Sequence, residues 1–325
     1  MIFVITLILL VYIMYRLYGH FFPAPNVDPR GKYVLISGCD SGFGNMLAIE
    51  LDKQGFNVLA GIYSPDSKAT LIDQLSSRAT VFPLDITRQQ DIVSAYEMVK
   101  SKTNVLYALV NNAGISSGGH IDWISTESIR QMMDINFFGH VAMTKTFLPL
   151  LIAKRNSRVV NITSVAGFIC PPSASAYCAS KYALESFSDC LRREMSVWSL
   201  QVSIIEPGVM RTPIVQKHGQ TVRQLRMQLS TDVQERWGEE FFTAYAEQLK
   251  GNLLVKWAED PVKVVRALQH AVTSTSPCIR YRPGWQSKFV YFPLSIIPTW
   301  LSDFYFCKAR PSSVLPAGTR KQLPM

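Results

Sequence analysis

Residues 33–44, YVLISGCDSGFG, decide the fold class of this 325-residue chain. The run YVLIS (33–37) is short, apolar and followed by glycine, a pattern typical of a buried strand. A helical pattern begins at Gly42 and continues to about Gln54. A glycine-rich turn between a strand and a helix lets the backbone approach a pyrophosphate, whose charge the helix N-terminus favours. The sequence therefore predicts a dinucleotide site at this turn, formed by Gly38, Ser41, Gly42, Phe43 and Gly44.

The glycine spacing is G-x-x-x-G-x-G and differs from the more common dinucleotide form G-x-G-x-x-G. An isolated glycine motif is more often only a tight turn. Here the motif stands between a predicted strand and a predicted helix, which is the context that a dinucleotide site requires. The position of the motif therefore carries more weight than its composition.

Strand-like and helix-like segments alternate along the rest of the chain, which predicts an α/β fold with a doubly wound, Rossmann-like parallel sheet. We expect one catalytic domain over 30–283, interrupted by a polar insertion at about 213–258 that forms a substrate lid. Further strands are expected at 57–62, 80–84, 105–110, 158–163 and 201–205, and helices at 88–101, 126–154 and 175–198.

Small and polar residues follow several of these strands, at the edge where ligands bind in such a sheet. Asp85 ends the third strand, where a carboxylate is placed to bond an adenine amine. The fourth strand ends in the small residues of VNNAG, and the sixth in EPGVMRT. These ends add Asn112, Ala113, Gly114, Pro207, Gly208 and Thr212 to the expected cofactor site.

The stretch YCASK (177–181) places a tyrosine four residues before a lysine, so both side chains share one face of a helix. A neighbouring cation favours the phenolate, and lowering the tyrosine pKa from near 10 makes it a candidate general base. The chain contains a second such pair, Tyr96 and Lys100. Spacing alone is therefore not diagnostic, and such a pair is usually a solvated helix face. Ser164 follows the fifth strand, shortly before Tyr177.

Taken together, these motifs resemble the short-chain dehydrogenase/reductase family over roughly residues 30–283. The stretches GCDSGFG, ESFSDCLRREM and RYRPGWQSKFVYFPLSIIPTWLSD narrow the resemblance to the membrane-associated retinol and hydroxysteroid dehydrogenases, a group close to 3-hydroxybutyrate dehydrogenase. One departure is Ser37, where the family usually has threonine; it keeps the hydroxyl.

The resemblance implies a role for each candidate catalytic residue. Ser164 would bond the substrate oxygen, and Tyr177 would act as the general acid/base. Lys181 would hold the nicotinamide ribose and favour the phenolate. Asn136 would support a proton relay, and Thr212 would bond the nicotinamide carboxamide. NAD is favoured over NADP, because Asp66 follows the second strand and no basic residue adjoins that strand end.

The composition excludes several other classes of protein. The net charge is +9, but the basic residues are scattered without the aromatic interleaving of a nucleic-acid site. Six cysteines are dispersed with no CxxC pair, so no structural metal is expected. Five scattered histidines give little support to a Ser/His/Asp hydrolase.

Both ends of the chain are strongly apolar. Residues 1–22 predict a retained membrane anchor rather than a cleaved signal peptide, because a basic n-region and an A-x-A-like site are missing. The basic residues that follow the anchor place the catalytic domain on the cytosolic side of the endoplasmic reticulum or another intracellular membrane. Residues 284–325 form a tail whose segment 289–306 contains two prolines and is expected to lie in the membrane interface; the alternative is packing on the domain.

The anchor, the tail and the insertion indicate a bulky lipid alcohol as substrate, either retinol or a hydroxysteroid, without separating them. Four aromatic residues of the insertion are expected to line the lid: Trp237, Phe241, Phe242 and Tyr245. A 3-hydroxybutyrate-type dehydrogenase with Arg211 or Lys217 on the carboxylate is one alternative. A non-catalytic nucleotide or sterol sensor is another, and a homodimer is compatible with the sequence.

Overall fold

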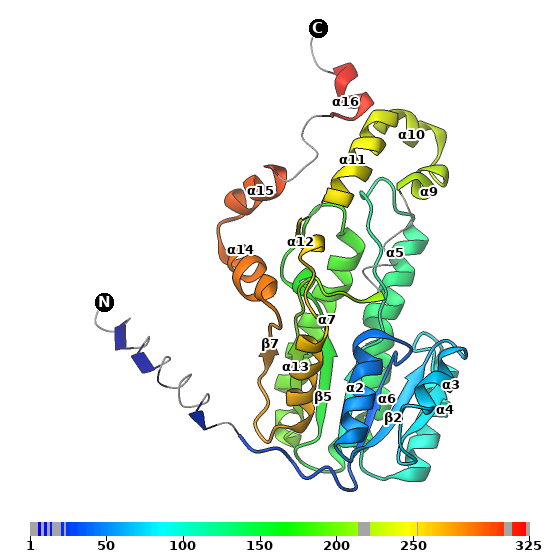
Figure 1. Cartoon of the computed structure of the whole chain (residues 1–325), viewed down its shortest axis with the longest axis vertical. Coiled ribbons are helices and arrows are strands. Elements are labelled where there is room, and N and C mark those ends of the chain that lie inside the picture. The colour runs from blue at the N-terminus through cyan, green and yellow to red at the C-terminus, as the bar shows by residue number, and fades with distance from the viewer. Residues whose placement is uncertain are drawn as a thin grey trace.

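The computed structural model describes residues 24–213, 222–251, 253–308 and 314–322, together with single positions before residue 24. Most of the expected anchor (1–22) and Lys217 lie outside these residues. The described chain forms one seven-stranded parallel sheet flanked by helices, with a group of short helices beyond one end (Figure 1).

The sheet has the strand order β3-β2-β1-β4-β5-β6-β7, and every described pair is parallel. The order reverses between β1 and β4, which is the topological switch point where ligands bind in doubly wound sheets. The predicted fold class is therefore confirmed. The strands are β1 (Tyr33–Ile36), β2 (Asn57–Ile62), β3 (Thr80–Pro83), β4 (Ala108–Asn111), β5 (Arg158–Ile162), β6 (Gln201–Ile205) and β7 (Arg280–Tyr281).

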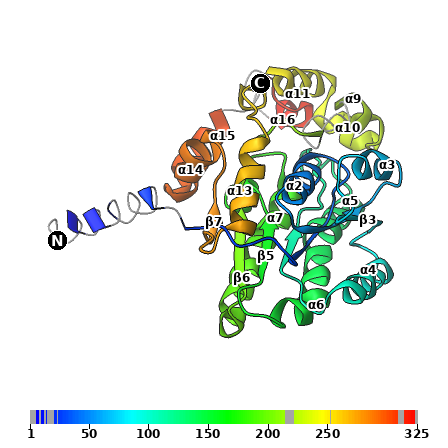
Figure 2. The same cartoon turned by 60° about the horizontal axis from the view of Figure 1, so that its bottom comes forward.

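The helices cover both faces of the sheet (Figure 2). On one face α2 (Gly42–Lys53) and α13 (Val262–Thr273) bury residues such as Leu47 and Leu268 against the sheet. On the other face α4 (Gln89–Lys102), α6 (Gly139–Ile152) and α7 (Ser175–Glu194) bury residues such as Ile92, Phe147 and Leu191. The strands are buried on both sides, so they are continuously apolar in sequence.

The structure differs from the sequence-based boundaries at β4. The expected strand 105–110 is observed as Ala108–Asn111. The backbone N–H of Leu106 bonds the carbonyl of Leu150, outside the sheet, and so it does not extend the ladder. At its other end the strand continues through Asn111, whose side chain is fully buried and donates to Asn161 Oδ1 at 2.8 Å.

The expected helix 126–154 is interrupted by a π-helical turn. The segment consists of α5 (Thr126–Met133), the π-helix η1 (Asp134–Phe138) and α6. Within the described residues this stretch, to Ile152, is the one helix long and apolar enough to cross a membrane by length and composition. Its apolar residues Met143, Phe147 and Leu151 are fully buried in the core on the sheet, as expected of a core helix.

Short helices beyond the carboxyl ends of the strands form a cap over the domain (Figure 1). An aromatic cluster holds the first three of them to the segment before α5, through Trp123, Phe241, Phe242 and Tyr245. Gly238, between α10 and α11, lies against Ala317 of α16, and Arg320 pairs with Glu240. The cap comprises α9 (Val222–Met227), α10 (Thr231–Trp237), α11 (Glu239–Gly251), α12 (Leu253–Lys256) and α16 (Ala317–Gln322).

The apolar segment 289–306 forms η4 (Ser287–Tyr291), α14 (Phe292–Ile296) and α15 (Thr299–Lys308). Tyr291 and Phe306 pack with Val165 and Ile169 of the domain. Exposed large apolar side chains remain on the same segment: Phe289, Ile296, Trp300 and Phe304. The segment therefore packs on the domain with one set of residues and exposes another set. The remaining short elements are α3 (Ser67–Ile72), η2 (Val165–Gly167) and η3 (Met195–Trp198).

Candidate active site

The glycine turn after β1 is held tightly against the end of β4. A Cβ on Gly44 would lie 2.3 Å from Asn112 Nδ2, and one on Gly38 would lie 2.8 Å from Ala113 Cα. Gly38 also has a φ of +70°, which favours glycine. Both positions therefore require glycine, because any side chain would separate the turn from the next strand end.

Ser37 and Asn112 lock these two loops together. The Ser37 hydroxyl accepts the backbone N–H groups of Asn112 and Ala113, both at 3.1 Å. The Asn112 amide donates to the carbonyls of Ser37 and Gly38, both at 2.8 Å. The hydroxyl at position 37 is therefore used structurally, which explains why serine serves in place of threonine.

The residues of the turn fit a dinucleotide. Gly42 has a φ of +64° and open space where a Cβ would stand. The side chain of Ser41 makes no hydrogen bond to cap α2, so the first N–H groups of the helix are not used by it. An anion is favoured at such a helix N-terminus. These features match the needs of a pyrophosphate.

The carboxylate at the end of β2 comes from Asp40, inside the glycine turn. Asp40 Oδ1 accepts the backbone N–H of Ser64 at 2.7 Å and the Ser67 hydroxyl at 3.1 Å. Asp66, which the sequence favoured for this place, is exposed and does not line the pocket. Asp40 therefore stands where an acid would meet the cofactor ribose, and only the folded chain brings it to β2.

A single large pocket opens from this edge of the sheet, with a volume of about 1930 Å³. Sites for one small molecule measure roughly 300–1,000 Å³, so this pocket has room for a dinucleotide and a second bulky molecule. It is lined by all of the predicted site residues except two, Gly44 and Asn136. Gly44 lies behind the wall, where it permits the close contact with Asn112.

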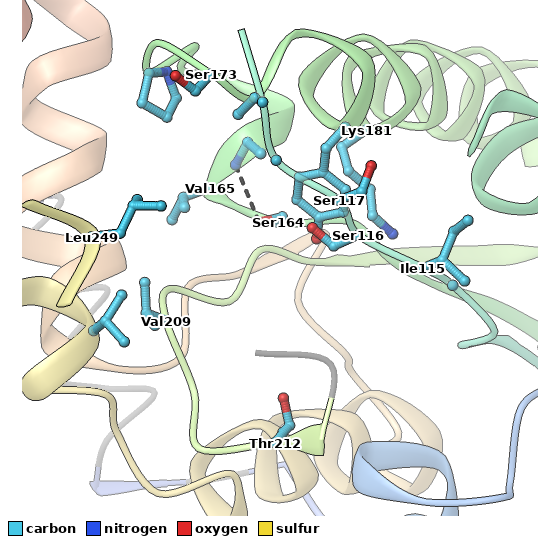
Figure 3. Close-up of a pocket in the computed structure, with 18 of the residues that line it drawn as sticks. Ile115, Ser116, Ser117, Ser164, Val165, Ser173, Lys181, Val209, Thr212 and Leu249 are labelled. Atoms are coloured by element: carbon cyan, nitrogen blue, oxygen red, sulfur yellow. Dashed lines mark hydrogen bonds between the residues drawn. The ribbon is translucent and has the colours of Figure 1, made fainter. Parts of the chain in front are cut away.

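Tyr177, Ser164 and Lys181 all line the pocket. Figure 3 labels Ser164 and Lys181 among the lining residues. Ser164 ends the loop after β5, and its Oγ accepts the Ala166 N–H at 3.2 Å. Tyr177 and Lys181 lie one turn apart on α7, with Lys181 Nζ 5.8 Å from the centre of the tyrosine ring. Lys181 Nζ also donates to the carbonyl of Ile162 at 2.9 Å. The fold therefore brings together three of the four predicted catalytic side chains.

In the protein without cofactor, burial is the main cause of the pKa shifts of Tyr177 and Lys181. It raises the pKa of Tyr177 to about 12, and the hydrogen bond with Ser164 opposes this shift. Burial also lowers the pKa of Lys181 to about 8, opposed by the charge of Glu185. The sequence predicted a lowered tyrosine pKa. Without cofactor the protein raises the pKa of Tyr177 instead, because the cost of desolvating the phenolate is larger than the stabilisation by its polar neighbours.

Asn136 lies behind the pocket wall, within η1. Its Oδ1 accepts the backbone N–H of Ile115, and its Nδ2 donates to the carbonyl of Ile115, both at 2.9 Å. Nδ2 also donates to Ser180 Oγ at 3.1 Å. The side chain thus joins the loop after β4 to α7, while the π-helical turn alters the backbone hydrogen bonding around it.

The loop after β6 closes the opposite side of the pocket. Pro207 accepts the N–H of Val165, and Thr212 lies across the pocket from Ser164 (Figure 3). Behind the loop Glu206 pairs with Arg280 at 2.9 Å and with Arg282 at 2.7 Å. Burial raises the pKa of Glu206 to about 7. These ion pairs fix the turn to β7.

Several residues in or behind the pocket escaped prediction. His140 of α6 is fully buried near Lys181, and burial lowers its pKa to about 3, so the ring is neutral. His120 and Ser173 line the other end of the pocket with Tyr245. No sequence signal marks His140, His120 or Ser173, since each comes from a loop or helix outside the recognised motifs. Tyr245 was expected to line the lid, and it lines the pocket. Arg211 bonds the Ala258 carbonyl and does not line this pocket.

Comparison with known proteins agrees with this geometry. The model of the short chain dehydrogenase family matches residues 32–223. Retinol dehydrogenase 16 of Rattus norvegicus is 39% identical over 297 residues, covering 88% of this chain and 92% of that protein. 17-beta-hydroxysteroid dehydrogenase type 6 of Bos taurus is 39% identical over 287 residues, covering 87% and 90%.

Solved structures share the fold at lower identity. A short chain dehydrogenase/reductase from Burkholderia phymatum, in complex with NAD, superposes with a TM-score of 0.69 at 19% identity, over 89% of this chain and 99% of that one. A short-chain dehydrogenase from Streptomyces avermitilis gives 0.67 at 23% identity, over 86% and 97%. The chain therefore belongs to the short-chain dehydrogenase family, as a nicotinamide-dependent oxidoreductase that acts on CH–OH groups.

Proposed function

We propose that this enzyme interconverts the alcohol and the carbonyl form of a bulky lipid, a hydroxysteroid or retinol, at the pocket that Tyr177 lines. The observation that carries the proposal is the pocket, whose outer part is lined by apolar and aromatic residues from the cap and tail, among them Leu225, Phe241 and Leu315. The similarity to a retinol dehydrogenase and a 17-beta-hydroxysteroid dehydrogenase supports the same substrate class.

The candidate catalytic residues have geometry compatible with their proposed roles. Ser164 orients the substrate oxygen, and Tyr177 exchanges a proton with it. Lys181 faces the tyrosine ring from a buried position and would hold the nicotinamide ribose. The side chain of Asn136 is fully engaged with Ile115 and Ser180, so its contribution is to position the loop and α7. If Asn136 supports a proton relay through water, its main chain rather than its side chain would hold the water molecule.

When bound, the nicotinamide would accept the hydride of the alcohol in its oxidised form or donate a hydride to the carbonyl in its reduced form, and the oxidised ring would add a positive charge to the site. That charge favours phenolate and counters the burial that raises the pKa of Tyr177. The residues that would hold the cofactor are Gly38, Ser41, Gly42, Phe43, Asp85, Asn112, Ala113, Gly114, Tyr177, Lys181, Pro207, Gly208 and Thr212, with Gly44 behind them.

We further propose NAD as the preferred cofactor. The Asp40 carboxylate lies at the end of β2, where it would accept ribose hydroxyls and repel a 2′-phosphate. Asp85 is held in its own turn by Thr87, at 2.7 Å and 2.9 Å, and still lines the pocket for the adenine. Replacing Asp40 with asparagine should reduce the preference for NAD over NADP, because one like-charge repulsion is removed.

The enzyme is proposed to act at an intracellular membrane, such as that of the endoplasmic reticulum, with its catalytic domain facing the cytosol. The exposed side chains of η4 and α15, including Phe289 and Trp300, support contact with a lipid surface. Residues 1–22 would serve as the anchor and 284–325 as the associating tail. A homodimer remains part of this proposal.

The decisive experiment assays membrane-bound enzyme with retinol, with hydroxysteroids and with 3-hydroxybutyrate, each with NAD and NADP. We expect turnover of a lipid alcohol with NAD and none of 3-hydroxybutyrate. Arg211 donates to the Ala258 carbonyl and does not line the pocket, so it is not placed to bind the carboxylate of 3-hydroxybutyrate. Absence of turnover by intact protein that binds NAD would overturn the proposal in favour of a nucleotide or sterol sensor.

A further inference from the structure

A polar cluster stands in the apolar outer part of the pocket, formed by Ser173, His120 and Tyr245. His120 Nε2 lies 3.5 Å from Ser173 Oγ. The Tyr245 hydroxyl also hydrogen-bonds Ser173. All three residues line the pocket, and they come from three separate segments: the loop before α5, the loop before α7 and α11.

The backbone around this cluster is held in a defined geometry. Ser173 has a φ of +67°, which is uncommon for a residue with a side chain. Its carbonyl accepts the N–H of Gly119 at 2.9 Å, so the two loops are joined at this point. Strained backbone that neighbours maintain is often found at ligand sites. The position of the Ser173 hydroxyl is therefore set by the fold.

The surroundings of the cluster are aromatic. The His120 ring lies 4.4 Å from Trp123, 4.8 Å from Trp237 and 5.1 Å from Tyr245, measured between ring centres. Trp237 in turn donates to Asp122 at 2.6 Å, which ties the loop of His120 to the cap. Hydroxyl groups among apolar walls can each donate or accept, because their hydrogen rotates. Such a cluster suits one oxygen atom of an otherwise apolar ligand.

The cluster lies away from the reacting centre and from the nicotinamide side. In Figure 3 Ser173 and Thr212 lie on opposite sides of Ser164. Ser173 precedes α7, while Tyr177 stands in its first turn. A substrate with its alcohol at Ser164 and Tyr177 therefore extends toward Ser173 and the cap.

We infer that Ser173, His120 and Tyr245 form a subsite for a second oxygen atom of the substrate, so that the preferred substrate is a steroid with an oxygen at each end rather than retinol. This inference rests on the proposed function and refines its substrate class. Retinol carries one oxygen, and its ring end would place hydrocarbon against the polar cluster. A site that bonds a substrate oxygen discriminates against an analogue without it, because the analogue forms no hydrogen bond there.

The test compares substrates that differ only at the far end. Androsterone and dihydrotestosterone each have one alcohol and one ketone, at opposite ends, and each is compared with the deoxy analogue that lacks the ketone. Retinol serves as the third substrate class. For the wild-type enzyme we expect kcat/KM for one ketone-bearing steroid to exceed that of its deoxy analogue by about tenfold or more.

Two variants and a matched control assign the preference to the cluster. Tyr245→Phe removes a hydroxyl and keeps the ring, and Ser173→Ala removes the other hydroxyl. Each should reduce the ratio of the two kcat/KM values toward one. Tyr96→Phe removes a hydroxyl from a tyrosine that does not line the pocket, and it should leave the ratio unchanged.

The outcomes separate the two proposals. A wild-type enzyme that turns over retinol or both steroids, with no preference for the ketone, would overturn the subsite and leave the proposed function standing. A preference that persists in both variants would also overturn the subsite. An enzyme that turns over none of these alcohols, although it binds NAD, would overturn both.

Discussion

Two helices of this enzyme carry the same pair of side chains in the same local geometry. On α4, Lys100 Nζ lies 5.8 Å from the ring centre of Tyr96, and on α7, Lys181 Nζ lies 5.8 Å from that of Tyr177. An i,i+4 spacing brings side chains together on any helix. The shared distance is thus a property of the helix and says nothing about chemistry.

The surroundings of the two pairs differ completely. Lys100 is exposed, and Tyr96 packs on Phe147 with ring centres 5.8 Å apart. Lys181 is 4% exposed, and its burial lowers its pKa to about 8. Tyr177 has Ser164 as a hydrogen-bonding partner and faces the large pocket. The comparison shows that tertiary packing, acting on an ordinary helical pair, creates the candidate acid/base site.

The largest expected difference between the pairs is in turnover. Tyr177→Phe should lower kcat/KM by about a thousandfold or more, since it removes the proposed general acid/base. Tyr96→Phe should leave kcat/KM within about twofold, because surface changes away from the site have small effects. Steady-state assays with a lipid alcohol and NAD measure both, and NAD binding checks that the site is intact. Equal losses in the two variants would contradict the assignment.

The next effect concerns the hydroxyl beside each tyrosine. Ser164→Ala should lower kcat by about a hundredfold, because both the substrate oxygen and Tyr177 lose a hydrogen bond. The matched change is Ser94→Ala on α4, where the hydroxyl donates to Gln90 on the helix surface. No change in kcat is expected there. An unaltered kcat in Ser164→Ala would remove this serine from the reaction.

A smaller effect is expected in the pH dependence of stability. Lys181 has a pKa of about 8 when folded and 10.5 as the reference for the unfolded chain. Between these values the unfolded state binds more protons, so the contribution of this group to stability rises with pH. From about pH 7.5 to about pH 9.5, wild type should gain about 2 kcal/mol relative to Lys181→Met.

Urea unfolding at the two pH values, in the absence of cofactor, measures this difference. Lys100→Met provides the control, since it removes an exposed lysine from a helix surface by the same substitution. A parallel pH dependence of wild type and Lys181→Met would show that Lys181 remains charged when folded, contrary to the expected effect of its burial.

The smallest effect is the stability of the α4 pair itself. Lys100→Met should change the free energy of unfolding by less than about 0.5 kcal/mol, because an exposed lysine near a ring contributes little. Thermal unfolding at one neutral pH is sufficient to measure it. A loss of several times this amount would mean that Lys100 has a structural role that its exposure does not indicate.

Much of the fold, and of the pocket edge proposed to hold the cofactor, was predictable because it depends on local patterns. The glycine turn, the small residues of VNNAG and the PG turn all follow buried strands, and parallel strands end at one edge. Gly44 shows the limit of such a prediction. The motif predicts Gly44 as a cofactor-binding residue, yet in the structure Gly44 permits the close approach of Asn112 and does not line the pocket.

Other features depend on contacts between distant segments. Asp40 reaches the end of β2 only through its bonds to Ser64 and Ser67, so sequence order pointed to Asp66 instead. The π-helical turn at Asn136 has no periodic signal to predict it. The proposed subsite of Ser173, His120 and Tyr245 unites three segments, and of these residues the sequence marked only Tyr245, as an aromatic residue of the lid.

The sequence by itself determined the alternation of strands and helices, the glycine turn and the pairing of Tyr177 with Lys181, because these follow from residues close together in the chain. Tertiary structure decided which of two identical tyrosine–lysine pairs is buried beside a serine and a cofactor-sized pocket. It also reversed the expected direction of the shift in the Tyr177 pKa, which burial raises in the protein without cofactor. The physical reason is desolvation, which depends on all the atoms packed around a group and on no single neighbour in sequence.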